Sequence, residues 1–202
     1  MKTILTLASV TLAVLLAGGV ARAATIQCPN GPITEIARYC YGTNQPDTMH
    51  GTSGSKRDRM WGEGGGDTMY GYGTVDRLVG GRGSDKLYGG SETDSLRGSE
   101  CAGAAGCTYS DSSNDYVHGG KGGDEILGGY AQGGVDRIYG EGGNDDISAS
   151  QKSWLHNGRS GFVVTKEIID CGPGSRDEVW FDRGVDVVKE NCEKKHGYPT
   201  RG

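Results

Sequence analysis

The chain has 202 residues, 38 of them glycine, and its formal net charge at pH 7 is −5. This acidity argues against a surface that binds nucleic acid and favours cations as partners. The six cysteines have no CxxC spacing and the four histidines are scattered, which argues against a zinc site.

The first 23 residues have the features of a secretory signal peptide. Lys2 supplies a positive charge, an apolar run extends from Ile4 to Leu16, and Ala21-Arg22-Ala23 offers a cleavage site of small residues. The apolar run is too short to span a bilayer. We therefore expect export, and removal of Lys2 and Arg22 without any acid would move the formal charge from −5 to −7.

Residues 24–41 are expected to form an N-terminal cap. The stretch from Ile33 to Tyr39, which follows Pro32, is the one helix-like segment of the mature chain. Cys28 and Cys40 flank it and could staple it in place. Atypical end units of this kind cover the exposed core and strand edges of stacked repeats.

An even number of cysteines in an exported chain favours disulfides. Fifteen connectivities of six cysteines are possible. Sequence order favours three local pairs, which are Cys28–Cys40, Cys101–Cys107 and Cys171–Cys192.

The central part of the chain is a repeat with a period of nine residues. The recurring aspartates are Asp58, Asp67, Asp76, Asp85 and Asp94. An aliphatic residue follows each of them two positions later, namely Met60, Met69, Leu78, Leu87 and Leu96. The most regular copy is Gly80-Gly81-Arg82-Gly83-Ser84-Asp85-Lys86-Leu87-Tyr88. A fixed period indicates that one small unit is stacked many times.

The period breaks after Arg97 and then resumes. Residues 98–113 contain Cys101 and Cys107, and we interpret them as an inserted loop clipped by a disulfide. The repeat continues with the aspartates Asp115, Asp124, Asp136 and Asp145, with a three-residue bulge at Tyr130-Ala131-Gln132. The repeats thus span residues 42–148, and residues 149–202 are expected to form an irregular segment and a disulfide-closed C-terminal cap.

The row pattern predicts where each side chain points. The last positions of a row form a short strand whose aliphatic residue faces inward, and the glycine-rich positions form a turn. If two rows make one full turn, every second aspartate lies on the same side. Asp58, Asp76 and Asp94 then line one edge, and Asp67 and Asp85 line the other.

Carboxylates stacked in this way need a counter-charge. Two charges about 5 Å apart repel by about 3 kcal/mol at an effective dielectric near 20. One buried aliphatic side chain per row, worth about 1.5–3 kcal/mol, is too little to order nine glycine-rich residues. Carboxylate and carbonyl oxygens favour a hard cation with flexible coordination, so the pattern predicts several bound Ca²⁺ ions as part of folding.

At these residues the chain resembles the RTX, or haemolysin-type, calcium-binding repeat family. The resemblance implies an all-β fold, a right-handed parallel β-roll, with calcium held between turns by aspartate carboxylates and turn carbonyls. The turn glycines that it marks are Gly80, Gly81, Gly83, Gly119, Gly120 and Gly122. Another residue replaces a motif glycine at Glu63, Tyr72, Thr74 and Glu92, and sites fed by those turns are expected to be weak or empty. The cysteine-flanked C-terminal end is similar to stand-alone bacterial members.

The outer faces of the roll offer a second possible role. Tyr70 and Tyr88 close rows two periods apart and should stack on one outer face, and Trp61 lies on the opposite face beside Val79 and Arg97. Such aromatics could bind a glycan or another cell-surface polymer, although cross-strand aromatics also simply stabilise sheets. An enzymatic role has no sequence support, because HExxH and GxSxG are both absent. The sequence therefore predicts a secreted, non-enzymatic calcium-binding protein with a structural or adhesive role and no membrane span.

Overall fold

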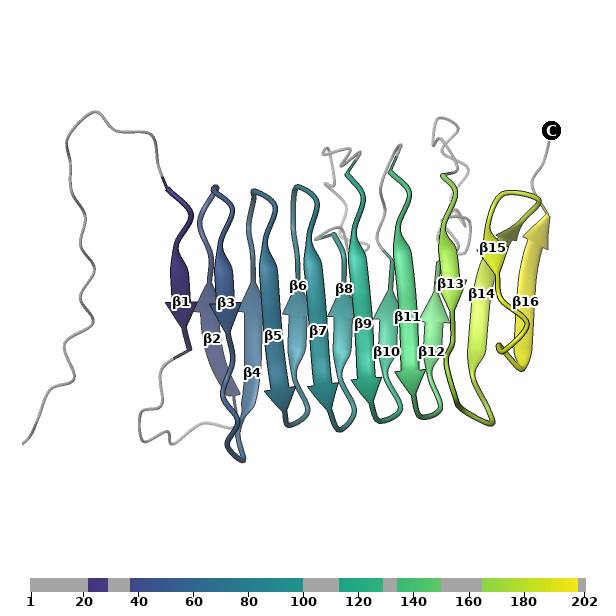
Figure 1. Ribbon diagram of the computed structural model, residues 1–202, viewed down its shortest axis with the longest axis horizontal. Coiled ribbons are helices and arrows are strands. Elements are labelled where there is room, and N and C mark those ends of the chain that lie inside the picture. Colours follow the sequence, from purple (N-terminus) through teal and green to yellow (C-terminus); the bar gives the residue numbers. More distant parts are fainter. Residues whose placement is uncertain (1–21, 29–36, 100–112, 129–133, 150–164, 200–202) are drawn as a thin grey trace, which may run out of the picture.

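The computed structural model describes residues 22–28, 37–99, 113–128, 134–149 and 165–199. These residues form a parallel β-roll of two sheets with eight strands each, and they contain no helix (Figure 1). The first sheet consists of β1 (Thr25–Gln27), β3 (Thr48–His50), β5 (Thr68–Gly73), β7 (Lys86–Ser91), β9 (Tyr116–Lys121), β11 (Arg137–Gly142), β13 (Ile168–Asp170) and β15 (Val187–Val188). The second sheet consists of β2 (Ala37–Tyr41), β4 (Arg57–Trp61), β6 (Arg77–Val79), β8 (Ser95–Arg97), β10 (Glu125–Leu127), β12 (Asp146–Ser148), β14 (Glu178–Arg183) and β16 (Lys194–Pro199). The predicted β-roll is confirmed.

Successive strands alternate between the two sheets, so two nine-residue rows make one full turn. Along the regular rows each strand pairs in parallel with the strand 18 residues further on; Thr68, for example, lies opposite Lys86. Side chains alternate in direction along each strand. The aliphatic residue of each row therefore points between the sheets, and the residues on either side of it point outward.

The core is a single file of these inward-facing side chains. Each is 0% exposed: Met49, Met60, Met69, Leu78, Leu87, Leu96, Val117, Ile126, Ile138, Ile147, Ile169 and Val179. One aliphatic side chain per row contributes about 1.5–3 kcal/mol. Because the sheets share no larger core among the described residues, the rest of the stability must come from the strand hydrogen bonds and the turns.

Extra residues enter the roll in its turns and leave the core register intact. The aspartates of neighbouring turns are 18 residues apart at Asp67 and Asp85, 30 apart at Asp85 and Asp115, and 21 apart at Asp115 and Asp136. The predicted bulge Tyr130-Ala131-Gln132 and most of the predicted loop 98–113 lie outside the described residues. Leu87 nevertheless lies opposite Val117, and Val117 opposite Ile138.

The N-terminal cap differs from its prediction. The helix expected over Ile33–Tyr39 is wrong where the structure describes it, because Ala37–Tyr41 forms β2 and pairs with β4. A seven-residue helix is marginal by itself, whereas β2 satisfies its backbone on the open edge of the second sheet. Tyr39 and Tyr41 point outward and Cys40 inward, as strand alternation requires.

Two of the three predicted disulfides lie within the described residues. Cys28 is bonded to Cys40 at one end of the roll, and Cys171 is bonded to Cys192 near the other. Cys101 and Cys107 lie outside the described residues. The strands continue beyond residue 148, since β13 to β16 extend both sheets as far as Pro199.

Candidate metal centre

The row aspartates lie in two ladders, one along each edge of the roll. The edge-one ladder consists of Asp47, Asp67, Asp85, Asp115 and Asp136, at turns that lead from the second sheet to the first. The edge-two ladder consists of Asp58, Asp76, Asp94, Asp124, Asp145 and Asp177, at turns that lead the opposite way. All eleven side chains are between 0% and 2% exposed. The predicted alternation of aspartates between the two edges is confirmed.

One carboxylate oxygen of each ladder aspartate except Asp58 links neighbouring turns. The backbone N–H of a ladder aspartate donates to Oδ1 of the equivalent aspartate one turn later, with nitrogen–oxygen distances of 2.7–2.9 Å. At the C-terminal end of the edge-two ladder, the N–H of Asp177 donates to Glu193 at 2.8 Å. These bonds to a charged acceptor are stronger than neutral ones and fix the carboxylates in register.

The other carboxylate oxygen has no hydrogen-bond partner at six of these positions. It is Oδ2 of Asp67, Asp76, Asp94, Asp124, Asp145 and Asp177. At the N-terminal row of edge two, Asp58 accepts bonds from Thr52 through Oδ2, and its Oδ1 is the unpartnered atom. A buried carboxylate oxygen without a donor is costly, because the charge has lost its water and gained nothing.

These unpartnered oxygens face carbonyl oxygens of the next turn. A Cβ placed on Gly89 would lie 2.5 Å from Asp94 Oδ2 and 2.5 Å from the carbonyl oxygen of Gly119. A Cβ on Gly119 would meet Asp124 Oδ2 at 2.5 Å and the carbonyl oxygen of Gly140 at 2.6 Å. Two acceptors therefore converge on space that only glycine leaves open. A cation satisfies both of them, and an all-oxygen donor set fits Ca²⁺.

The pKa values of the ladder aspartates also show that the buried carboxylates lack a counter-charge. Burial, the largest cause, raises the pKa of Asp94 to about 8 against the lowering effect of its hydrogen bond from Asp76. Burial likewise raises the pKa of Asp67 to about 7 and that of Asp76 to about 6. It raises the pKa of Asp124 to about 6 and that of Asp145 to about 7. Without a bound cation, burial therefore disfavours the ionised form of these carboxyls.

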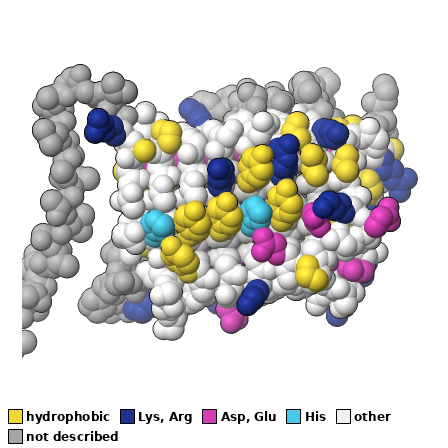
Figure 2. Space-filling model, viewed as in Figure 1, with side chains coloured by type: hydrophobic (Ala, Val, Ile, Leu, Met, Phe, Trp, Pro, Cys, Tyr) yellow, Lys and Arg dark blue, Asp and Glu magenta, His cyan; other side chains and the backbone are white. Residues whose placement is uncertain are grey.

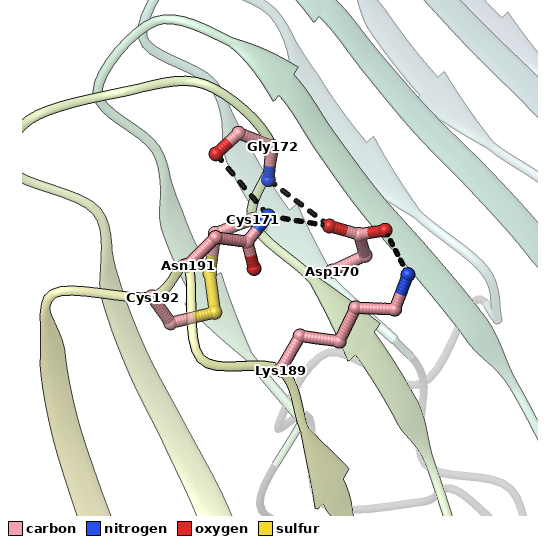
Figure 3. Close-up of polar contacts among 6 residues, drawn as sticks. All are labelled: Asp170, Cys171, Gly172, Lys189, Asn191 and Cys192. Atoms are coloured by element: carbon pink, nitrogen blue, oxygen red, sulfur yellow. Dashed lines mark hydrogen bonds and ion pairs between the residues drawn. A yellow bond between two sulfur atoms is a disulfide. The ribbon is translucent and has the colours of Figure 1, made fainter.

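Asp170 shows what a satisfied carboxylate looks like in this protein (Figure 3). Lys189 Nζ lies 2.6 Å from its Oδ2, and Asn191 Nδ2 donates to its Oδ1 at 2.7 Å. The hydrogen bond from Lys189 is the largest cause that lowers the pKa of Asp170. This aspartate follows a buried strand residue and lies outside both ladders. Within the described residues, no such lysine contacts the six ladder oxygens that lack a donor.

The backbone keeps its left-handed conformation at three of the four predicted replacements of motif glycines, and Thr74 is the exception. Gly81 and Gly83 have φ values of 109° and 108°, in the left-handed region. Glu63, Tyr72 and Glu92 stand at equivalent positions and have φ values of 71°, 78° and 75°. A non-glycine residue in this region carries a strain of about 1 kcal/mol or more. At Glu63, Tyr72 and Glu92 the backbone therefore stays in the region that the motif glycines adopt, although the sequence departs from the motif.

All nine aspartates predicted as metal ligands lie in the two ladders, and the predicted turn glycines lie in the turns that carry these aspartates. Within the described residues, no three histidine, cysteine, aspartate or glutamate side chains converge as a metal centre. An ion held by the ladders would thus draw on backbone carbonyls as well as on carboxylates. The predicted set omitted Asp47 and Asp177, although both precede an aliphatic residue by two positions. It also omitted Glu167, which occupies the row-aspartate position before β13 and is 1% exposed.

The outer aromatics lie where the sequence predicted. Tyr70 and Tyr88 stack with ring centroids 5.0 Å apart. Figure 2 shows the row of hydrophobic and histidine side chains that crosses the first sheet. This first-sheet aromatic row consists of His50, Tyr70, Tyr88, His118 and Tyr139, with successive centroid distances of 5.3, 5.0, 5.0 and 4.6 Å. On the second sheet Trp61 of β4 stacks against Tyr39 and Tyr41, which both lie on β2.

Comparison with known proteins identifies the repeats. Residues 41–74, 70–100 and 130–151 match the family described as RTX calcium-binding nonapeptide repeat (4 copies). No curated protein matches the chain, and no solved structure matches it either. In the part of the chain that the structure describes, no helix has the length and apolar character needed to cross a membrane.

Proposed function

The chain carries RTX calcium-binding nonapeptide repeats, and on that premise we propose that it is an exported β-roll whose folding depends on calcium bound between its turns. The observation that carries this proposal is the set of buried carboxylate oxygens that lack a donor and face the carbonyl oxygens of the next turn. The ladder aspartates and turn carbonyls would hold the ions. Calcium would supply the positive charge that both kinds of oxygen lack.

Folding should depend strongly on calcium, because many carboxylates are stacked along each edge of the roll. Equivalent aspartates repeat once per turn, about 4.8 Å apart along the roll. At an effective dielectric near 20, each neighbouring pair of ionised carboxylates repels by about 3 kcal/mol. One core side chain per row stabilises the fold by about the same amount. Ionised ladders without cations would therefore cancel most of the stabilisation that comes from the core.

We propose a structural or adhesive role for the folded roll outside the cell. The sequence contains neither HExxH nor GxSxG, and the ladders fit a metal that joins turns rather than one that activates a substrate. Export is supported by the signal-like residues 1–23 and by the paired cysteines Cys28–Cys40 and Cys171–Cys192.

The test is far-ultraviolet circular dichroism of the oxidised chain without residues 1–23. We expect a β spectrum in about 1 mM CaCl₂, which is the affinity range of extracellular calcium modules, and a largely disordered spectrum in EGTA. Magnesium at the same concentration is the control and should restore little, because it demands a rigid octahedral site. The same β spectrum in EGTA and in calcium would reject metal-driven folding.

Glycan binding is a second candidate function, and the first-sheet aromatic row is the surface that would carry it. Its ring faces cover one another, so it presents edges, the tyrosine hydroxyls and the imidazoles to solvent. A glycan would thus bind by hydrogen bonds to this row rather than by stacking on exposed faces. A glycan-array screen with the Tyr70→Ala/Tyr88→Ala variant as control tests this; an array that the parent chain does not bind removes the candidate.

A further inference from the structure

The outer face of the second sheet carries two parallel rows of side chains, one residue from each strand. The charged row, from β2 to β16, is Tyr39, Arg59, Arg77, Ser95, Glu125, Asp146, Glu178 and Lys194. The apolar row beside it is Tyr41, Trp61, Val79, Arg97, Leu127, Ser148, Trp180 and His196. Strand pairing fixes the order of residues in both rows.

Charge is segregated along the charged row. Its N-terminal half holds Arg59 and Arg77, with Arg97 beside them in the apolar row, and its C-terminal half holds Glu125, Asp146 and Glu178. The pKa of Arg77 is lowered, first by burial and then by Arg97 and Arg59. The pKa of Asp146 is raised, first by burial and then by Glu178 and Glu125. The N-terminal half is therefore basic, and the C-terminal half is acidic at Glu125 and Asp146. Glu178, at the end of the acidic half, already has contacts within the chain, because Lys194 Nζ lies 3.4 Å and His196 Nε2 lies 2.7 Å from its carboxylate oxygens.

The central charges of both clusters lack partners within the described part of the molecule. Neither Arg77 nor Asp146 has an ion pair or a hydrogen bond to another described side chain, and both are exposed. Arg59 donates to the Tyr39 hydroxyl at 2.9 Å rather than to a carboxylate. Like charges placed together without counter-charges weaken the fold, so a partner that neutralises both clusters would bind favourably.

We propose that this face binds the same face of a second copy of the chain. A two-fold axis that runs parallel to the strands relates the two copies. Such an axis turns the second sheet of one copy to face that of the other and reverses the roll direction, but it leaves each row opposite itself. With eight strands per sheet, β4 then faces β14, β6 faces β12, and β8 faces β10. The basic half of each copy meets the acidic half of the other.

This arrangement places opposite charges against each other at two levels of the sheet, where β4 faces β14 and β6 faces β12. Arg59 faces Glu178 of the second copy, and Arg77 faces Asp146 of the second copy. In the apolar row Trp61 faces Trp180 of the second copy. No level of the described rows places like charges opposite each other. A linear polyanion would match the arginine half but would be repelled by the acidic half, so the observations favour a second copy.

The face is small, which sets the expected affinity. Eight strands at about 4.8 Å spacing, with two side-chain rows, bury on the order of 500 Å² per copy, below the roughly 800 Å² of a standard interface. The contacts are partly exposed ion pairs and are screened by salt. We therefore expect a dimer with a Kd on the order of 10–100 µM at low ionic strength, weakened at least tenfold at high ionic strength.

Sedimentation equilibrium of the calcium-loaded, oxidised chain tests the proposal. The chain should dimerise at about 20 mM NaCl and dissociate at about 500 mM NaCl. Arg77→Glu alone places a second carboxylate opposite Asp146, and Asp146→Arg alone places a second guanidinium opposite Arg77, so each variant should be monomeric. An equimolar mixture of the two variants should associate again, because positions 77 and 146 then carry opposite charges across both halves of the heterodimer.

Two further sets of variants serve as controls for this interface. Lys86→Glu changes the charge of the first sheet equally and should leave dimerisation unchanged. Arg59→Glu mixed with Glu178→Arg provides a second charge-swapped pair if the first cannot be prepared in folded form, as judged by circular dichroism in calcium.

The proposal is overturned by a parent chain that stays monomeric at about 200 µM, several times the expected Kd. Folded charge-swapped variants that do not associate when mixed overturn it as well. Monomers that bind heparin through Arg77 would overturn it in favour of a polyanion.

Discussion

A ladder aspartate such as Asp94 divides its carboxylate between two tasks. One oxygen accepts a backbone N–H from the neighbouring turn, and the other faces a carbonyl oxygen with no donor between them. The first contact is a feature of the polypeptide alone, whereas the second requires a cation. A change that keeps the first contact and removes the charge therefore separates the two contributions.

Asp94→Asn makes that separation. The amide oxygen can still accept the N–H of Asp76, and the amide nitrogen can donate to the carbonyl of Gly119. We expect the free energy of unfolding of the metal-free chain to rise by about 1 kcal/mol. Calcium affinity should fall about tenfold or more, because the affinity of a calcium site depends on the charge of its ligands. Thermal unfolding with and without calcium measures both effects.

Asp170→Asn is the matched control for this change. Its carboxylate is neutralised by Lys189 and lies outside the ladders. This substitution should lower the free energy of unfolding by about 0.2–1 kcal/mol, and by the same amount with and without calcium. If Asp94→Asn behaves in the same way as Asp170→Asn, the ladder carboxylates have no special relation to calcium.

Gly89→Ala tests the space beside the carboxylate. The added Cβ would lie 2.5 Å from Asp94 Oδ2 and from the Gly119 carbonyl oxygen, closer than real Cβ contacts come. We expect the free energy of unfolding to fall by about 1–3 kcal/mol, and calcium to induce less β structure. Calcium titration followed by circular dichroism measures the second effect. Gly73→Ala is the control, because nothing lies within 4 Å of its added Cβ. Equal effects of the two substitutions would contradict the assigned role of this space.

At the scale of strands and turns, the nine-residue period was enough to predict most of the roll. It predicted which residues face inward, the alternation of aspartates between edges, and the placement of Tyr70 against Tyr88. These features follow from strand alternation and a constant row length, both of which are local. The extra residues between Asp85 and Asp115 could be located because the period resumes after them.

Features that depend on tertiary pairing could not be predicted in this way. Ala37–Tyr41 has no repeat signal and becomes a strand because β4 offers it an open edge. Glu167 takes a row position after a long break in the period, with a different acid. The charge segregation of the second sheet requires the register across the inserted residues, which brings Glu125 next to Ser95.

The two aspartate ladders should make the thermal stability of the fold depend on pH. The direction of this dependence should differ between the metal-free and the calcium-bound chain. Folding raises the pKa of Asp67, Asp76 and Asp94 from 3.8 to about 7, 6 and 8. A carboxyl with a raised folded pKa contributes stability below its unfolded pKa, and that contribution is lost as pH rises through the folded value. The metal-free chain should therefore have a higher melting temperature at about pH 5 than at about pH 8.

Calcium should reverse that order, because it binds the ionised carboxylates and competes with protons. In saturating calcium we expect the melting temperature at about pH 8 to equal or exceed that at about pH 5. Melting curves of desalted and calcium-saturated protein across this pH range provide the measurement. A metal-free chain that is more stable at the higher pH would show that the ladder carboxylates are satisfied without a cation.

At the scale of the whole molecule, the roll is two thin sheets around a single file of aliphatic side chains. Its two described disulfides, Cys28–Cys40 and Cys171–Cys192, close short loops near the ends and do not join distant turns. Cohesion between neighbouring turns therefore rests on strand hydrogen bonds and on what neutralises the ladders. This is why we expect loss of calcium to unfold the roll as a unit rather than loosen one turn.

Small-angle X-ray scattering of the oxidised chain without residues 1–23 tests this account most directly. A folded chain of this length has a radius of gyration of about 16–20 Å, and an unfolded one approaches about 45 Å. We expect the compact value in calcium and a value well above about 30 Å after calcium is removed, with full recovery when it is added back. The same compact radius in both conditions would contradict the claim that calcium holds the turns together.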